Sequence, residues 1–155
     1  MSIATVLILL ALATAAMIWI SLRPSAQLQL PALRAVRHWT DDDETDVVGE
    51  SHYHAAIAKV AGNTGGAHAD KKCTAFLVPQ DSNPHDKDAV MVVIDGHHVG
   101  HLSRSDASDF RERLKDEGIP GAVTSCGAHI GWGGRGREGK QLSYSIKLKV
   151  SMLSD

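Results

Sequence analysis

The side chains best suited to chemistry lie in two short segments in the middle of the chain. Asn83-Pro84-His85-Asp86 is a polar turn that ends in a carboxylate, and His101-Leu102-Ser103-Arg104 ends in a cation. Polar groups gather where the backbone turns, and loops held by a rigid scaffold are where binding residues tend to lie, so these segments are candidate binding segments. Asp86 has an equally good structural interpretation, because aspartate in such a turn often stabilises its own loop.

Histidine is the other reactive side chain that the sequence concentrates. Seven of the nine histidines lie between His52 and His101. A zinc site needs ligands at fixed separations, and the chain has neither a His-Glu-x-x-His motif nor a Cys-x-x-Cys pair. No Gly-x-Ser-x-Gly elbow orders a nucleophile either. We therefore expect no metal, no cofactor and no catalytic residue, with a His-based metal site or a hydrolase as remote alternatives.

Three local elements position the two segments. Ala89 to Ile94 is a nearly continuous apolar run, which is typical of a strand buried on both faces. Asp95-Gly96 favours a tight hairpin turn, after which Val99 to Leu102 is expected to pair back. Ser103-x-x-Asp106 then predicts the capped start of a helix, which should end before Gly118.

The remaining segments complete a mainly β pattern. Further short strands are expected at Val47–Glu50, Cys73–Val78, Gly121–Ile130 and Leu142–Met152, and a helix is expected from Tyr53 to Gly62. The Gly-rich stretch from Gly131 to Gly139 is expected to be a loop. The order predicts one mainly β (α+β) domain over residues 46–155, an OB-like six-stranded β-barrel with two helices.

The beginning of the chain is apolar rather than globular. From Ile3 to Leu22 no residue is charged, and a helix of this length rises about 30 Å, the thickness of the hydrocarbon core. Residues 1–22 are therefore predicted to form a transmembrane anchor. A cleaved signal peptide is the alternative, although no Lys or Arg precedes the run. Arg23, Arg34 and Arg37 follow it, which predicts a single-pass membrane protein with its C-terminal domain in the cytoplasm.

Residues 23–45 are expected to be a juxtamembrane linker. It contains two prolines and most of an acidic run, Asp41 to Glu50, which favours a solvated segment, in part helical between Ala32 and Trp39. From Ser51 onward 13 basic and 12 acidic residues nearly balance, so a strong non-specific affinity for phosphate backbones is not expected. Two cysteines are too few for a disulfide framework.

Three segments, in this order, resemble the HIRAN domain family. They are Val47-Val48-Gly49-Glu50, Asn83-Pro84-His85-Asp86-x-x-Ala89-Val90 and Val99-Gly100-His101-Leu102-Ser103-Arg104. The resemblance covers about residues 46–152 and implies an oligonucleotide-binding-like barrel with two helices. It also implies a module that, in its characterised relatives, holds the 3′ end of single-stranded DNA. Those relatives carry helicase or nuclease domains, for which this chain has no motif, so it resembles a stand-alone, membrane-anchored member.

The resemblance also implies roles for single residues. Asp86 matches the family's aspartate, which implies an acceptor for a terminal 3′-hydroxyl, and Arg104 matches a basic position suited to a phosphate. His85 stands where relatives often carry tyrosine and offers a smaller stacking surface with a pH-dependent charge. His52 and Tyr53 follow the first motif, where the family places aromatic ligand contacts.

Three further assignments keep structural alternatives. Tyr53 also continues the apolar stripe of the first helix, which favours a core role. His101 is as consistent with a structural role as with a ligand contact. Trp132, with Arg135 and Arg137, has the composition of single-strand binders, but a hairpin tip that needs its glycines is favoured.

Two functions are compatible with these features. The first is a membrane-tethered, HIRAN-like module that binds single-stranded nucleic acid, and Asp86, Arg104 and the motif match favour it. The alternative is a protein- or peptide-interaction module on the same barrel, which the balanced charge, His85 and the apolar anchor favour.

Overall fold

The computed structural model describes residues 33–62, 68–132 and 142–153. The apolar run predicted to be a transmembrane anchor lies outside these residues, as does most of the Gly-rich stretch predicted to be a loop. Across the described ranges, no helix is both long enough and apolar enough to cross a bilayer.

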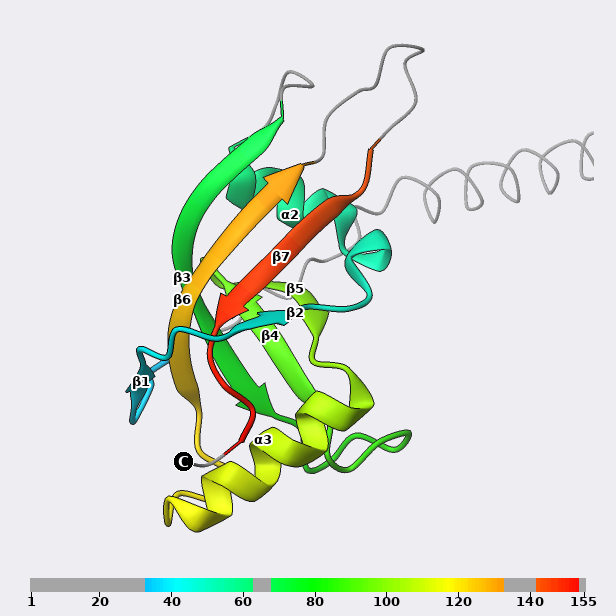
Figure 1. Cartoon of the computed structure of the whole chain (residues 1–155). Helices are drawn as coiled ribbons and strands as arrows, with labels where there is room; N and C mark the ends of the chain where they lie inside the picture. The colour runs from blue at the N-terminus through cyan, green and yellow to red at the C-terminus, as the bar shows by residue number, and fades with distance from the viewer. Residues whose placement is uncertain (1–32, 63–67, 133–141, 154–155) are drawn as a thin grey trace, which may run out of the picture.

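Six strands form one curled, antiparallel half-barrel (Figure 1). They are β2 (Glu44–Asp46), β3 (Ala69–Pro79), β4 (Val90–Ile94), β5 (His97–His101), β6 (Thr124–Trp132) and β7 (Tyr144–Lys149). Their order across the sheet is β2-β7-β6-β3-β4-β5, and a two-residue strand, β1 (His38–Trp39), pairs in parallel with β6. The architecture is mainly β, as predicted, and is consistent with an OB-like fold.

Alternating side chains give the sheet one face that is buried in the core. In β7, Tyr144, Ile146 and Leu148 are buried, while the lysines between and after them are exposed. β4 is buried along its whole length, as its continuous apolar run predicted. The predicted hairpin follows it. Asp95 and Gly96 have φ angles of 48° and 75°, as expected for the two central residues of a type I′ turn.

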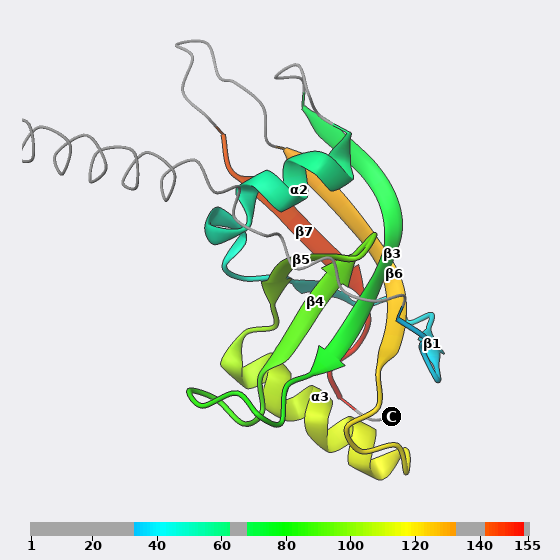
Figure 2. The same ribbon diagram turned by 180° about the vertical axis from the view of Figure 1, so that it is seen from behind.

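Two helices of the described residues lie at opposite ends of the curled sheet (Figures 1 and 2). α2 (His54–Ala61) buries Ala56, Ile57 and Val60 and ends at Gly62, as the apolar spacing predicted. α3 (Arg104–Asp116) is preceded by the predicted N-cap. There the Ser103 hydroxyl accepts from the backbone N–H of Asp106 at 3.2 Å.

The two edges of the sheet meet beside β5. The backbone N–H of Val47 donates to Ile146 in β7 at 2.9 Å. The next residue, Val48, exchanges two backbone hydrogen bonds with His101, at 2.8 and 3.0 Å. Consecutive residues thus link β7 to β5, and this bridge holds the curled sheet together at its edges.

The strand predicted at Val47–Glu50 is displaced in the structure. The regular strand lies earlier, at Glu44–Asp46, and Glu50 begins a short 3-10 helix, η1 (Glu50–His52). Gly49 has a φ of 85°, a left-handed conformation that turns the chain out of the bridge and into η1. Apolar residues alone could not separate a strand from a single bridge followed by a turn.

The segment ahead of β2 belongs to the folded domain, in contrast to the predicted solvated linker. Trp39 is 2% exposed and meets Phe110 of α3 edge-on, with ring centroids 6.1 Å apart. His38–Trp39 is strand, so the helical tendency predicted up to Trp39 is wrong for these residues. Asp41, from the acidic run, accepts from Arg113 of α3 at 2.7 Å. The fold therefore extends ahead of the boundary predicted at residue 46.

Candidate functional site

A β-bulge in β5 places two histidines on the same face of the sheet. Val93 pairs with His98 and Met91 pairs with His101, and the register shifts by one residue at Val99. Without the shift, residues three apart in a strand would lie on opposite faces. The extra residue brings both imidazoles to one face.

These two imidazoles form a ring cluster with Tyr53. The Tyr53 ring lies 4.1 Å from that of His98 and 6.1 Å from that of His101, and the two imidazoles are 4.6 Å apart. Tyr53 lies between η1 and α2, and its backbone N–H donates to the carbonyl oxygen of Glu50 at 3.0 Å. Its side chain is half-buried against the core, which confirms the predicted core role, and its contact with a ligand stays a prediction.

The loop between β3 and β4 is held against this cluster by side-chain amides. Asn83 Oδ1 accepts from the backbone N–H groups of His85 and Asp86, at 3.0 and 3.3 Å, which makes the polar turn rigid. Asn83 Nδ2 in turn donates to Gln80 Oε1 at 3.3 Å. His101 Nε2 lies 3.2 Å from the same Gln80 oxygen and therefore donates to it.

Asp86 has the predicted loop-stabilising role and also lies near Arg104. Its Oδ1 accepts from the backbone N–H of Asp88 at 3.0 Å, which is the loop-stabilising role. Its Oδ2 lies 4.0 Å from Arg104 Nε, at the first turn of α3. The Asp86 side chain is 28% exposed and that of Arg104 is 87% exposed, so the carboxylate is held in place while the cation reaches into solvent.

Both imidazoles are electrically neutral at pH 7. Burial lowers the pKa of His98 to about 4, and the neighbouring His101 acts in the same direction. Burial also lowers the pKa of His101, against the opposing effect of the Asp86 carboxylate. His98 Nε2 is 3.0 Å from the Gly100 carbonyl oxygen and must carry the proton, because a carbonyl only accepts.

The stability of the fold is expected to fall when the pH drops below about 6.5. Between that value and the folded pKa of about 4, the unfolded chain binds a proton at His98 that the folded chain does not. We expect a loss of about 1–2 kcal/mol, less than the full shift implies because His98 is only half-buried. Urea unfolding at about pH 7.5 and about pH 5 measures it. His98→Gln should lose the part of this pH dependence that His98 contributes and keep the part that His101 contributes, whereas His97→Gln should keep both. Equal behaviour of the two variants would contradict the assignment.

Two predicted site residues flank the cluster, and one lies elsewhere. His85 and His52 are exposed and precede Asp86 and Tyr53 in the chain. Trp132 ends β6 beside Ala69, the first residue of β3, whereas the loop that carries Asp86 follows the other end of β3. Trp132 is 66% exposed with a φ of 64°. The structure therefore does not bring Trp132 to the other candidates.

His98 and Gln80 belong to the candidate site but were not among the binding residues expected from the sequence, where His98 was considered only for a remote metal site. His98 had no motif, and only a bulge in β5 turns it toward Tyr53. Gly100, two residues on, was the available signal, because glycine inside a strand often marks a bulge or a close backbone contact. Gln80 had no signal in the sequence.

An open groove of about 660 Å³ adjoins the site along the loop. It is lined by Val78, Pro79, Gln80, Asp81, Ser82, Asn83, Pro84 and Met91. Val78, Pro79 and Met91 come from β3 and β4, and Pro84 and the polar members come from the loop between these strands. Across the described part of the chain, no group of three or more His, Cys, Asp or Glu side chains has an arrangement suited to a metal ion.

Comparisons with known proteins add one solved structure. No family model matches the sequence, and no curated protein matches it. The crystal structure of the HIRAN domain of human HLTF is similar to this chain at 20% identity, covering 70% of this chain and 75% of that one, with a TM-score of 0.34. At this TM-score the fold is inferred from the strands described above and not from the comparison. The family resemblance rests on the three sequence motifs.

Proposed function

We propose that this protein is a HIRAN-like binding module that holds single-stranded nucleic acid, without catalysis of its own. The observation that carries the proposal is the cluster at the end of β5, where Asp86, Arg104, His101 and Tyr53 come from three separate segments. These are four of the residues to which the motif resemblance gives ligand-binding roles. Neutral rings, an ordered carboxylate and an exposed cation are the groups that bind the end of a nucleic-acid strand.

Each group has a part in the proposed complex. A terminal base stacks on the exposed imidazole of His85 or His52, beside the ring cluster of Tyr53, His98 and His101. The terminal 3′-hydroxyl donates to Asp86, whose conformation its own loop already holds. Arg104, largely in solvent, pairs with the adjacent phosphate. With one such cation, binding should depend only weakly on salt.

Asp86→Asn is expected to weaken binding to a strand with a free 3′-hydroxyl about tenfold, through loss of a charge-assisted hydrogen bond. The amide oxygen can still accept from the backbone N–H of Asp88, so the loop keeps its shape. The measurement is a titration of the whole chain with a fluorescent single-stranded oligonucleotide, with a free or a phosphorylated 3′ end. Asp88→Asn, an exposed neighbour, is the matched control and should bind as the wild type does.

Two outcomes would contradict the nucleic-acid proposal. One is the absence of binding at low salt, where phosphate contacts are strongest. The other is an equal loss in Asp86→Asn for both kinds of 3′ end, which would mean that the carboxylate acts on the loop and not on the hydroxyl.

A second candidate, capture of a peptide, is favoured by the groove beside the site. Val78, Pro79, Pro84 and Met91 give it apolar walls, and an extended peptide binds such a surface through alternate side chains. If the oligonucleotide titration fails, this candidate is tested with a peptide library. Binding of a peptide that is lost in Met91→Lys would support it.

We also propose that residues 1–22 tether the module to a membrane, with the domain in the cytoplasm. The support is the uncharged run from Ile3 to Leu22 and the arginines that follow it. An alkaline phosphatase fused after Asp155 and expressed in a bacterium should be inactive, because this enzyme needs the oxidising periplasm. An active fusion would reverse the proposed orientation.

A further inference from the structure

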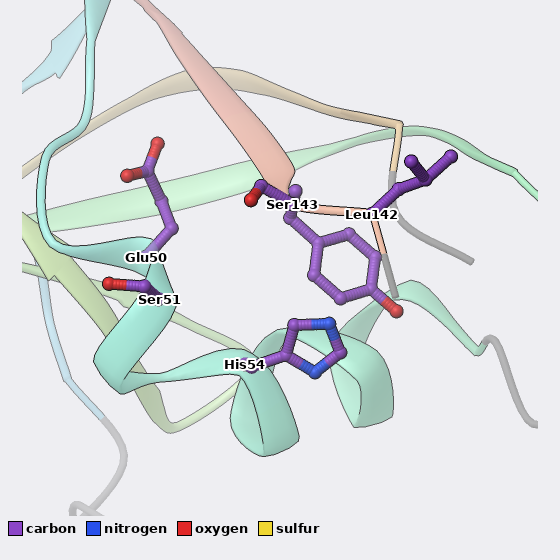
Figure 3. A pocket seen from close by; sticks show the side chains of 6 residues that line it. Glu50, Ser51, His54, Leu142 and Ser143 are labelled. Atoms are coloured by element: carbon purple, nitrogen blue, oxygen red, sulfur yellow. The ribbon is translucent and has the colours of Figure 1, made fainter. Parts of the chain in front are cut away.

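A second pocket lies on the other side of η1, between η1, α2 and the start of β7 (Figure 3). Its volume is about 280 Å³, and it is lined by Glu50, Ser51, His54, Leu142, Ser143 and Tyr144. Glu50 and Ser51 lie on η1 on one side, and Ser143 lies across from them, while the Ser51 hydroxyl points away from Ser143. The pocket is slightly smaller than the usual site of a drug-sized molecule, which favours a small head group.

The lining has the chemistry of a cation site. Glu50 supplies a carboxylate, and Ser143 supplies a hydroxyl oxygen that can accept hydrogen bonds. The rings of His54 and Tyr144 lie 4.7 Å apart and form an aromatic corner. Among the described residues, no Lys or Arg lines this pocket. A cation is attracted both by an aromatic face and by a carboxylate.

The pocket walls are held by backbone contacts within η1 and between the chain before η1 and β7. His52 N–H donates to the Gly49 carbonyl oxygen at 3.0 Å, which shapes η1. Val47, just ahead of η1, donates to Ile146 of β7, so the two walls are tied together. Tyr53 and His54 are consecutive, but the ring of Tyr53 meets β5 and that of His54 meets β7.

We propose that this pocket binds an alkylammonium group, with the charge at Glu50 and the alkyl chain leaving past Leu142. A phosphate would be repelled by Glu50, which sets this pocket apart from the proposed nucleic-acid surface. Two sources present this group: a lysine side chain of a protein partner and a free polyamine.

Binding is tested on the whole chain by NMR titration with n-butylammonium chloride. We expect saturable shifts of the Ser51 and Ser143 amides, with a dissociation constant on the order of 1 mM for so small a ligand. 1-Butanol has the same shape without the charge and should produce no saturable shift. Two further ligands distinguish the sources: spermidine stands for a free polyamine, and Nα-acetyl-lysine amide, which keeps its side-chain ammonium, stands for a protein partner. The ligand that binds more tightly indicates the source.

Two variants make the test specific. Glu50→Gln keeps the size of the side chain and removes its charge, and should weaken n-butylammonium binding about tenfold. Glu50→Asp keeps the charge and should bind more tightly than Glu50→Gln, which separates lost charge from lost structure. Glu112→Gln, at an exposed position on α3, is the matched control and should bind normally.

Three outcomes would overturn the proposal: no saturable shift, equal binding of 1-butanol, or the same loss in Glu112→Gln as in Glu50→Gln. Asp86→Asn should leave n-butylammonium binding intact. The result therefore stands or falls separately from the nucleic-acid proposal.

Discussion

Arg113→Ala is expected to lower the free energy of unfolding by about 3 kcal/mol. Arg113 is 5% exposed, and its Nη1 donates to Asp41 Oδ2 at 2.7 Å and to the Ser151 carbonyl oxygen at 2.5 Å. Its guanidinium also lies 4.1 Å from the centre of the Trp39 ring. One side chain thus joins α3 to the segment before β2 and to the C-terminal segment. Removing it leaves a cavity and a carboxylate without its partner.

The expected loss is at the lower end for a broken buried pair, because Asp41 is 25% exposed and water can solvate it. Urea unfolding of the wild type and the variant measures the difference. Lys115→Ala, at an exposed position on the same helix, is the control and should change stability by less than about 0.5 kcal/mol. Equal effects of the two substitutions would contradict the role of Arg113.

This contribution should depend on pH in a defined direction. The hydrogen bond from Arg113 lowers the pKa of Asp41 below its ordinary value of 3.8, with a smaller contribution from the backbone N–H of Ser151 and against the effect of burial. A carboxyl whose folded pKa is lowered stabilises the fold above its unfolded pKa, and that stability is lost as the pH falls through the folded pKa. The gap between the wild type and Arg113→Ala should therefore narrow below about pH 4.

Gly100→Ala is expected to destabilise the fold by about 2–3 kcal/mol, because the edges of the sheet meet on top of this glycine. A Cβ atom at Gly100 would lie 2.4 Å from Val47 Cγ1 and 2.7 Å from the Val48 carbonyl oxygen. The second atom is backbone and belongs to the bridge between Val48 and His101, so the bridge must open to make room. Hydrogen exchange of the Val48 and His101 amides, which form that bridge, should become faster.

Gly127→Ala is the matched control for this substitution. Gly127 lies in β6, and an added Cβ would meet only the Lys149 side chain, at 3.7 Å or more, which is ordinary contact. We expect its stability within about 1 kcal/mol of the wild type, because alanine also restricts the unfolded chain. If Gly100→Ala unfolds at the same urea concentration as Gly127→Ala, the close approach at Val47 and Val48 does not hold the sheet.

The elements predicted most accurately are those whose partners are near in sequence. Asp95-Gly96 forms the expected hairpin turn and Ser103 forms the expected helix cap, because each depends on contacts within a few residues. The buried faces of α2 and α3 follow from helical spacing in the same way. The resemblance to HIRAN domains also depends on these local segments, so it could be stated without any long-range contact.

The segment before β2 was assigned wrongly because its partners are remote. Asp41 accepts from Arg113 and from the backbone of Ser151, 72 and 110 residues away. In the sequence, Asp41 begins an acidic run that is typical of a solvated linker. Trp39 likewise gave no periodic signal, since its neighbours on the core come from α3 and β6.

The same difference between local contacts and contacts of distant segments holds for the candidate site. By itself, the sequence determined the polar turn of Asn83 to Asp86, the hairpin and the cap beside Arg104, because local backbone preferences specify them. Only the tertiary structure decided that Asp86, His101 and Tyr53 lie together, that a bulge adds His98, and that Trp132 lies elsewhere. Those relations depend on strand register and on the closure of the sheet at Val48, which are set by packing between segments far apart in the chain.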